Sequence, residues 1–206
     1  MEDIGELKAL QLDALREVAN IGAGHAATAL SQMTDRRIMI SVPEITITGL
    51  QEVSDVTGSA DEVVVAVLMH MLGDLTGRTL LMVPEANARL LCDLLLRREP
   101  GTTAEFGEME VSGLKEAGNI LGSAYMNALS DFMGMMLLPS VPSLEIDNAG
   151  AVITTAHLGF GRDRDFMFCV ETDFHFNEAG RKLKGHFLLL PDMASLKAIL
   201  GAIHMT

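Results

Sequence analysis

Cysteine is scarce in this chain of 206 residues, which contains only Cys92 and Cys169. The two are far apart and form no CxxC pair, so their spacing suits neither a disulfide framework nor a metal site. We expect both to be reduced thiols in the core. The six histidines have no ligand spacing between them. The sequence therefore predicts that this chain holds no metal.

Basic residues are also few, since 15 Lys and Arg stand against 28 Asp and Glu, giving a formal net charge of −13. This charge repels phosphate backbones and anionic membrane surfaces, so we expect no nucleic-acid partner and no membrane insertion. The acidic N-terminus lacks the basic region of a signal peptide. The longest uncharged segments, residues 117–130 and 132–144, are shorter than the roughly 18 apolar residues of a spanning helix. We expect a cytoplasmic protein.

Common catalytic motifs are missing too, among them GxSxG, the P-loop, HExxH and the EF-hand loop. One segment, Gly22-Ala-Gly24-His-Ala-Ala27, does match the GxGxxG/A dinucleotide fingerprint. That fingerprint follows a strand, whereas residues 7–21 have helical periodicity. We therefore expect Gly22, Gly24 and Ala26 to let another backbone pack closely, or to leave a bare surface for a partner protein.

The chain repeats itself once, with an offset of 99 residues. The segment Asp13-Ala-Leu-Arg-Glu17-Val-Ala-Asn20 matches Ser112-Gly-Leu-Lys-Glu116-Ala-Gly-Asn119, and each copy continues to a Ser-Val-Pro, ending at Pro43 and Pro142. With 49% hydrophobic residues, the composition predicts a sizeable core. We interpret residues 1–206 as a single domain of two related halves, residues 7–104 and 105–206.

Periodicity predicts the same order of elements in both halves. Each half opens with a long helix and closes with a shorter one, at residues 85–97 and 192–203. Strands are expected between them, at residues 38–47, 62–69 and 79–83 and at residues 151–157, 165–171 and 185–190. Residues 53–60 and 160–164 have the composition of polar loops. This order predicts an α+β fold with a largely antiparallel sheet.

The repeated polar residues fall on one stripe of each opening helix, because positions i, i+4 and i+7 share a face. We call Asp13, Glu17 and Asn20 the first motif, and Ser112, Glu116 and Asn119 the second motif. A solvated helix face is the simple alternative. Recurrence at a fixed offset, while neighbouring apolar residues have drifted, favours a function. Ser112 has no histidine near it in sequence, so a helix cap or first-turn role suits it better than a nucleophile.

The duplicated pattern Asp/Ser-x3-Glu-x2-Asn-x22-Pro resembles the CheC branch of the CheC, CheX and FliY family of phosphatases, which act on the phosphorylated chemotaxis regulator CheY. The resemblance runs from about residue 7 to the C-terminus. It implies a CheC-like pseudo-two-fold domain with two long motif helices on one face of the sheet. It also implies hydrolysis of the aspartyl phosphate of CheY.

The resemblance further implies a role for each motif residue. Asn20 and Asn119 would orient the attacking water, and Glu17 and Glu116 would pair with a lysine of the regulator. The remaining motif residues would cap or support the helix or end its link to a strand: Asp13, Ser112, Pro43 and Pro142. No cofactor would be held by this chain, because the regulator supplies its own Mg²⁺.

The family resemblance also implies that this chain binds and regulates the receptor deamidase CheD, with this chain a monomer or a heterodimer with CheD. Residues 143–148 alternate apolar and acidic side chains, and we expect Glu145 and Asp147 to contact CheD. An ordinary strand with one solvent-exposed face is the alternative. The competing function is a non-catalytic scaffold that binds CheD or CheY and uses the motifs only for docking. Intact asparagines in both motifs favour catalysis.

Overall fold

The computed structural model of the protein describes residues 9–42, 44–49, 59–157, 166–176 and 181–204. Within these ranges the chain forms five helices and eight strands. They follow in the order α1 (Ala9–Thr34), β1 (Ile38–Ser41), β2 (Ile45–Gly49), β3 (Val63–Gly73), β4 (Gly77–Pro84), α3 (Glu85–Leu95), α4 (Glu108–Met133), β5 (Leu137–Pro139), β6 (Ser143–Asn148), α5 (Ala149–His157), β7 (Phe166–Phe176), β8 (Arg181–Pro191) and α6 (Met193–His204).

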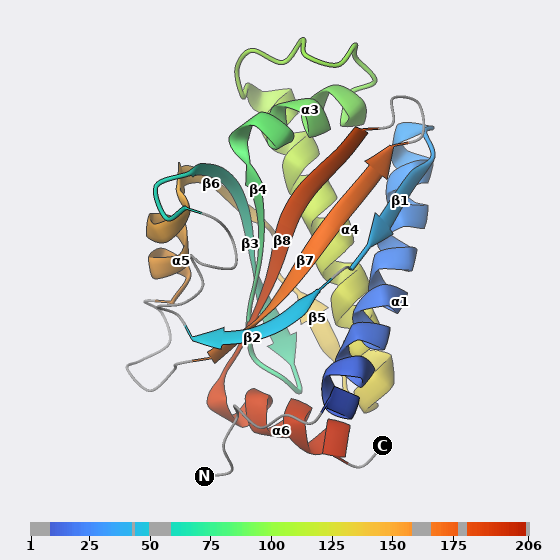
Figure 1. Cartoon of the computed structure of the whole chain (residues 1–206), viewed down its shortest axis with the longest axis vertical. Helices are drawn as coiled ribbons and strands as arrows, with labels where there is room; N and C mark the ends of the chain where they lie inside the picture. The colour runs from blue at the N-terminus through green and yellow to red at the C-terminus, as the bar shows by residue number, and fades with distance from the viewer. Residues whose placement is uncertain (1–8, 43, 50–58, 158–165, 177–180, 205–206) are drawn as a thin grey trace.

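The described strands form one antiparallel sheet in the order β1-β7-β8-β4-β3-β5, with β2 also paired to β7 and β6 also paired to β3 (Figure 1). The first half supplies the hairpin β3–β4 and the second supplies β7–β8. The hairpins meet at the centre, where Leu80 of β4 lies opposite Leu188 of β8. The short strands of each half pair with the hairpin of the other half: β1 and β2 pair with β7, and β5 and β6 pair with β3.

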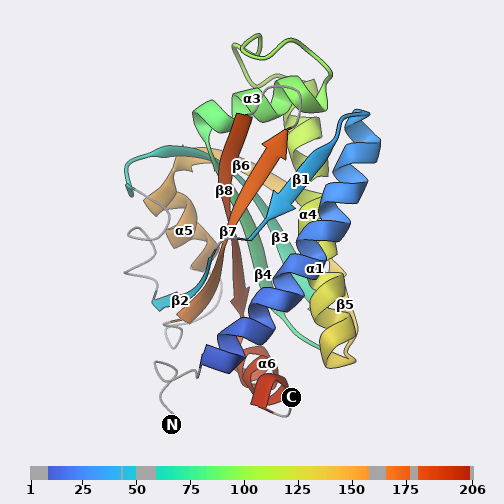
Figure 2. The ribbon, with the colours of Figure 1, turned by 45° about the vertical axis from the view of Figure 1, so that its right-hand side comes forward.

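Helices α1 and α4 lie side by side on one face of the sheet, with α3 and α6 at opposite ends of the pair (Figures 1 and 2). Successive strand residues face opposite sides of a sheet. On β3, Val65 and Val67 pack towards α1 and α4, whereas Val64 and Ala66 pack with α5 on the other face. This arrangement confirms the predicted α+β fold with two long helices on one face.

The prediction of a strand over residues 151–157 is wrong, because residues 149–157 form helix α5. The buried residues follow helical spacing, at Ala149, Val152, Ile153 and Ala156, and pack on the face of the sheet opposite α1 and α4. β-branched residues in this segment favour a strand locally. Burial of one apolar stripe against the sheet stabilises the helix and outweighs this local preference for a strand.

Smaller differences concern the edges of elements. The single strand expected over residues 38–47 is two strands, β1 and β2, and β3, β4, β7 and β8 are longer than expected. Residues 143–148 form the strand β6. The predicted loop over residues 160–164, most of that over residues 53–60 and the motif proline Pro43 lie outside the described residues.

Candidate functional site

The two long helices meet at a close crossing. A Cβ atom on Gly22 would lie 2.7 Å from Cδ1 of Tyr125, 3.0 Å from its Cα and 3.2 Å from the carbonyl oxygen of Ala124. Nearer the start of α1, Leu15 and Val18 share a core cluster with residues near the end of α4, namely Met126 and Leu129. The helices are therefore antiparallel, and the glycine lets their backbones approach.

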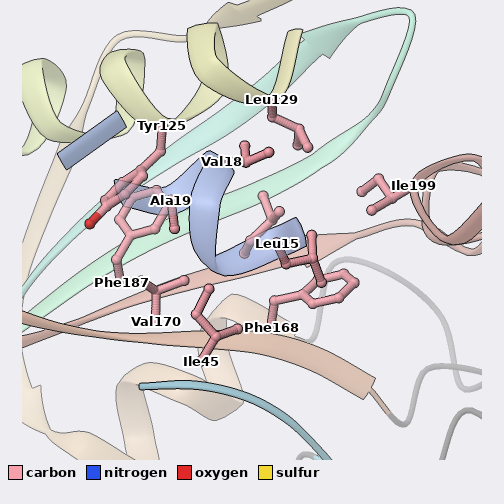
Figure 3. A pocket seen from close by; sticks show the side chains of 11 residues that line it. Leu15, Val18, Ala19, Ile45, Tyr125, Leu129, Phe168, Val170, Phe187 and Ile199 are labelled. Atoms are coloured by element: carbon pink, nitrogen blue, oxygen red, sulfur yellow. The ribbon is translucent and has the colours of Figure 1, made fainter. Parts of the chain in front are cut away.

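An apolar cavity of about 50 Å³ lies beneath the first motif (Figure 3). Leu15, Val18 and Ala19 of α1 line it, together with Tyr125 of α4 and apolar side chains of the sheet. The hydroxyl of Tyr125 lies 3.4 Å from Oγ1 of Thr172, and burial raises the pKa of Tyr125 to about 12. This inner face of α1 offers packing rather than chemistry, so the candidate site lies on its outer face.

The structure places the motif residues on the outer faces of α1 and α4. Asp13, Glu17 and Asn20 of the first motif are exposed, as are Ser112 and Glu116 of the second, and Asn119 is half-buried. Each motif occupies the N-terminal half of its own helix. Because the helices are antiparallel, the two motifs lie on opposite sides of the crossing. The geometry therefore provides two separate candidate sites.

The motif side chains have few partners of their own. Oγ of Ser123 donates a long hydrogen bond of 3.5 Å to Oδ1 of Asn119, while the equivalent neighbour of Asn20 is Gly24, which has no side chain. Within the described part of the chain, neither Glu17 nor Glu116 forms an ion pair. Both carboxylates are thus available to a cationic group of a partner.

The expectation that Ser112 caps its helix is wrong. Helix α4 begins at Glu108 with Gly107 as its N-cap, and the side chain of Glu110 accepts a hydrogen bond from the N–H of Gly107. Ser112 therefore lies in the second turn, where no unpaired backbone N–H remains to be capped. Asp13 lies similarly inside α1, four residues after Ala9. A supporting role for either residue stays a prediction.

The remaining predicted residues lie near β6. Pro142 is half-buried and directly precedes this strand. Glu145 and Asp147 are exposed on β6, where they lie opposite Ala66 and Val64 of β3. Those two residues pack with α5, so both acids are on the face of the sheet opposite α1 and α4. The structure therefore separates them from the two motifs.

The glycine-rich segment that resembles a dinucleotide fingerprint lies in the interior of α1. The expected close packing is confirmed for Gly22 and for Ala26, which is fully buried, but it is wrong for Gly24. A Cβ atom at Gly24 would have no neighbour within 4 Å, and the residue is exposed, as is His25 beside it. No strand and turn precede this segment in the described chain, so the fingerprint has no structural context.

The expectation of reduced core cysteines is confirmed. Cys92 and Cys169 are both free and buried, and burial, followed by nearby carboxylates, raises the pKa of each thiol to about 12. Among the described residues, no group of three or more histidine, cysteine or acidic side chains could hold a metal ion. No helix in the described part of the chain is both long and apolar enough to cross a membrane.

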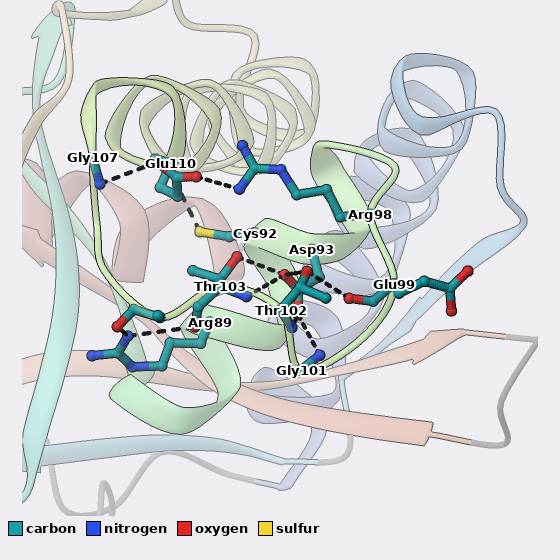
Figure 4. Close-up of polar contacts among 11 residues, drawn as sticks. Arg89, Cys92, Asp93, Arg98, Glu99, Gly101, Thr102, Thr103, Gly107 and Glu110 are labelled. Atoms are coloured by element: carbon teal, nitrogen blue, oxygen red, sulfur yellow. Dashed lines mark hydrogen bonds and ion pairs between the residues drawn. The ribbon is translucent and has the colours of Figure 1, made fainter.

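Sequence reasoning missed a polar cluster between α3 and the start of α4, which we call the α4 anchor: Asp93, Arg98 and Glu110 (Figure 4). The anchor lies outside the repeated pattern, so a search for recurrence passes over it. One signal was present in the sequence. Asp93 is an isolated acid within the apolar run Leu90-Leu91-Cys92-Asp93-Leu94-Leu95-Leu96. A charge in such a run requires a dedicated set of hydrogen bonds.

Comparison with known proteins agrees with this geometry. A model of the CheC-like family matches residues 10–47 and again residues 109–146, which reproduces the offset of 99 residues between the two motifs. Across 199 residues the chain is 35% identical to the CheY-P phosphatase CheC of Bacillus subtilis (strain 168), covering 96% of this chain and 95% of that protein. The chain belongs to the CheC-like family.

Two further proteins extend the comparison. The chain is 23% identical over 202 residues to the flagellar motor switch phosphatase FliY of Bacillus subtilis (strain 168), covering 98% of this chain and 51% of FliY. The crystal structure of Thermotoga maritima FliY superposes with a TM-score of 0.77 at 23% identity, covering 97% of this chain and 98% of that one. The CheC-like fold therefore spans nearly the whole chain.

Proposed function

We propose that this chain is a phosphatase that hydrolyses the aspartyl phosphate of a phosphorylated CheY-type response regulator. The observation that carries the proposal is the pair of repeated Glu/Asn stripes on the outer faces of α1 and α4. Membership of the CheC-like family, with a relative named CheY-P phosphatase, supports the same activity.

The chemistry asks little of the enzyme itself. An aspartyl phosphate is a reactive acyl phosphate, and water attack yields the free aspartate and inorganic phosphate. The regulator supplies the Mg²⁺ and a lysine, so the phosphatase needs mainly to orient a water in line with the bond that breaks. The amide of Asn20 or Asn119 holds that water, and Glu17 or Glu116 pairs with the regulator's lysine. No phosphoenzyme forms.

Exposure of the motif residues suits this mechanism. A side chain that works inside the phosphorylation pocket of a second protein must project from the surface and be free of internal partners. Glu17 and Glu116 have these properties within the described chain. Asn20 is exposed, and the fourth residue after it is Gly24, which offers no hydroxyl to its amide. Asn119 is half-buried and would have to release its long hydrogen bond from Ser123. The proposed mechanism therefore uses exposed side chains that are not needed to stabilise the fold.

The test is phosphate release from purified phosphorylated CheY. Asn20→Ala combined with Asn119→Ala should lower turnover by about 100-fold or more, because orientation of the water is lost. Asn127→Ala is the matched control, since Asn127 is an exposed amide on the same helix α4 outside the motif. The double variant should melt like wild type. Wild-type turnover in that variant would exclude water orientation by these amides. A wild-type chain that does not accelerate phosphate release would instead favour the non-catalytic scaffold.

We propose in addition that the β6 edge contacts the deamidase CheD through Glu145 and Asp147. The support is that β6 pairs only with β3 among the described strands, and both acids are exposed along it. Reversal of both charges to lysine should weaken binding of purified CheD in a calorimetric titration. Phosphatase activity should persist, because the motifs lie on the opposite face of the sheet. Unchanged affinity for CheD would place that contact elsewhere.

A further inference from the structure

The connection between the two halves is held by one buried carboxylate. Asp93, at the end of α3, is fully buried. Its two oxygens accept five hydrogen bonds of 2.6 to 3.2 Å from the backbone N–H groups of Gly101, Thr102 and Thr103 and from both threonine hydroxyls (Figure 4). Desolvation raises the pKa of Asp93, but these donors outweigh it and hold the pKa below its usual value. The carboxylate therefore stays charged and fixes the loop before α4.

A second carboxylate fixes the first turn of α4. Oε2 of Glu110 accepts a hydrogen bond of 3.0 Å from the N–H of Gly107, and Oε1 accepts one of 2.5 Å from Nη1 of Arg98. The N–H of Arg98 in turn donates to the carbonyl oxygen of Asp93 at 2.7 Å. Glu110 is buried, and the hydrogen bond from Arg98 holds its pKa below the usual value. The start of α4 is thereby tied to the end of α3.

The second motif follows this first turn on the same helix. A helix with its side chains has a radius of about 5 to 6 Å, so a rotation of 20° about its axis would move a side-chain tip by about 2 Å. Misplacement by 1 Å can lower a rate by about 100-fold. Gly118 lets α4 lie close to Val67 of β3, which sets the distance of the helix from the sheet. The α4 anchor restrains the remaining freedoms, rotation and sliding along the axis.

We propose that Asp93 and Glu110 are positioning residues of the second motif, which hold α4 at the rotation and axial position where Glu116 and Asn119 act together. The inference rests on the proposed phosphatase function. The first motif provides an internal comparison, because α1 approaches this region only near its C-terminal end, where Arg97 donates to the carbonyl oxygen of Met33 at 3.2 Å. Asn20 lies 13 residues before Met33, about 20 Å along the helix.

The test isolates each motif in the full-length chain. Asn20→Ala leaves only the second motif to act on phosphorylated CheY, and Asn119→Ala leaves only the first. Glu110→Ala should lower the kcat of the second motif by about tenfold or more with a smaller change in KM. The same substitution should change the kcat of the first motif by less than twofold. Glu110→Gln should recover part of the loss, because the amide oxygen of glutamine can still accept the hydrogen bond from the N–H of Gly107, while the ion pair with Arg98 is lost.

Thr103→Val provides a second variant, since it removes one hydrogen-bond donor to Asp93 with little change in shape. It should selectively lower the kcat of the second motif, by a smaller factor than Glu110→Ala. Melting curves establish that each variant is folded. Equal losses in both backgrounds, or no loss in either, would overturn the positioning role. If the wild-type chain does not accelerate phosphate release from phosphorylated CheY, the proposed function itself fails, and this result is distinct from both.

Discussion

Two glycines of α1 should respond in opposite directions to replacement by alanine. At Gly24 an added methyl group meets open space, so Gly24→Ala should stabilise the protein by up to about 1 kcal/mol through helix propensity. At Gly22 the same methyl group meets the ring and Cα of Tyr125 and the carbonyl oxygen of Ala124. Backbone atoms cannot swing aside, so overpacking costs about 1 to 3 kcal/mol against the same gain. Gly22→Ala should therefore be destabilising by up to about 2 kcal/mol.

Thermal unfolding followed by circular dichroism measures the difference directly. For a chain of this size 1 kcal/mol shifts the Tm by about 2 to 4 °C, so a difference of up to about 3 kcal/mol should separate the two variants by up to about 6 to 12 °C. Gly24→Ala is the matched control for Gly22→Ala, because both changes add one methyl group to the same helix. Equal melting temperatures would refute the close crossing at Gly22, and with it the placement of the motifs on either side of that crossing.

Three further outcomes are expected. Phe168→Ala should cost about 3 to 5 kcal/mol in urea unfolding, because this buried ring already borders the cavity under α1 and its loss enlarges the void. Asp93 has a folded pKa below its ordinary 3.8, so its contribution to stability is present above that value and is lost as the pH falls through the folded pKa. Asp93→Asn should thus be less stable at neutral pH and lose less of its remaining stability than wild type between about pH 5 and pH 3. Asn20→Ala and Asn119→Ala should each retain part of the phosphatase activity in single-turnover assays.

The repeat was the most informative feature of the sequence for predicting the fold. Recurrence of Glu17 and Asn20 at Glu116 and Asn119 indicated two equivalent long helices, and the structure places both helices on one face of the sheet. Local patterns could not predict that each half pairs its short strands with the hairpin of the other half, because strand partners depend on contacts distant in sequence. The structure of residues 149–157 was mispredicted for a related reason, since burial against the sheet outweighed β propensity.

The polarity of the motif residues was enough to predict that they are exposed, but it could not predict which residues surround them. The half-burial of Asn119 depends on the position of α4 against the sheet, and the hydrogen bond from Ser123 arises from a residue that differs between the two copies. The α4 anchor lies in the segment that joins the halves and has no repeated counterpart to reveal it. Repetition therefore identified the residues that the two motifs share but gave no information about what distinguishes the two candidate sites.

The spacing of the two motifs bears on how many regulators one chain can bind. Gly22 contacts Tyr125, so in an antiparallel pair Asn119 lies about 12 Å further along the pair than Asn20. The axes of packed helices are about 8 to 10 Å apart, which puts the two asparagines about 15 Å from each other. Both motifs lie on faces turned away from the sheet. Partners bound at the two motifs would approach from the same side.

A folded domain of about 100 residues has a radius of gyration of about 13 Å and is therefore more than 30 Å across. Two regulators of this size cannot both place their phosphorylation pockets over two motifs that lie about 15 Å apart on one surface. We therefore expect one regulator per chain at saturation, with the two motifs as alternative docking positions. Calorimetric titration with CheY carrying a phosphoryl mimic measures the stoichiometry, and Asn20→Ala should leave it at one. Binding of two regulators would mean that the motif stripes diverge enough for the partners to lie side by side.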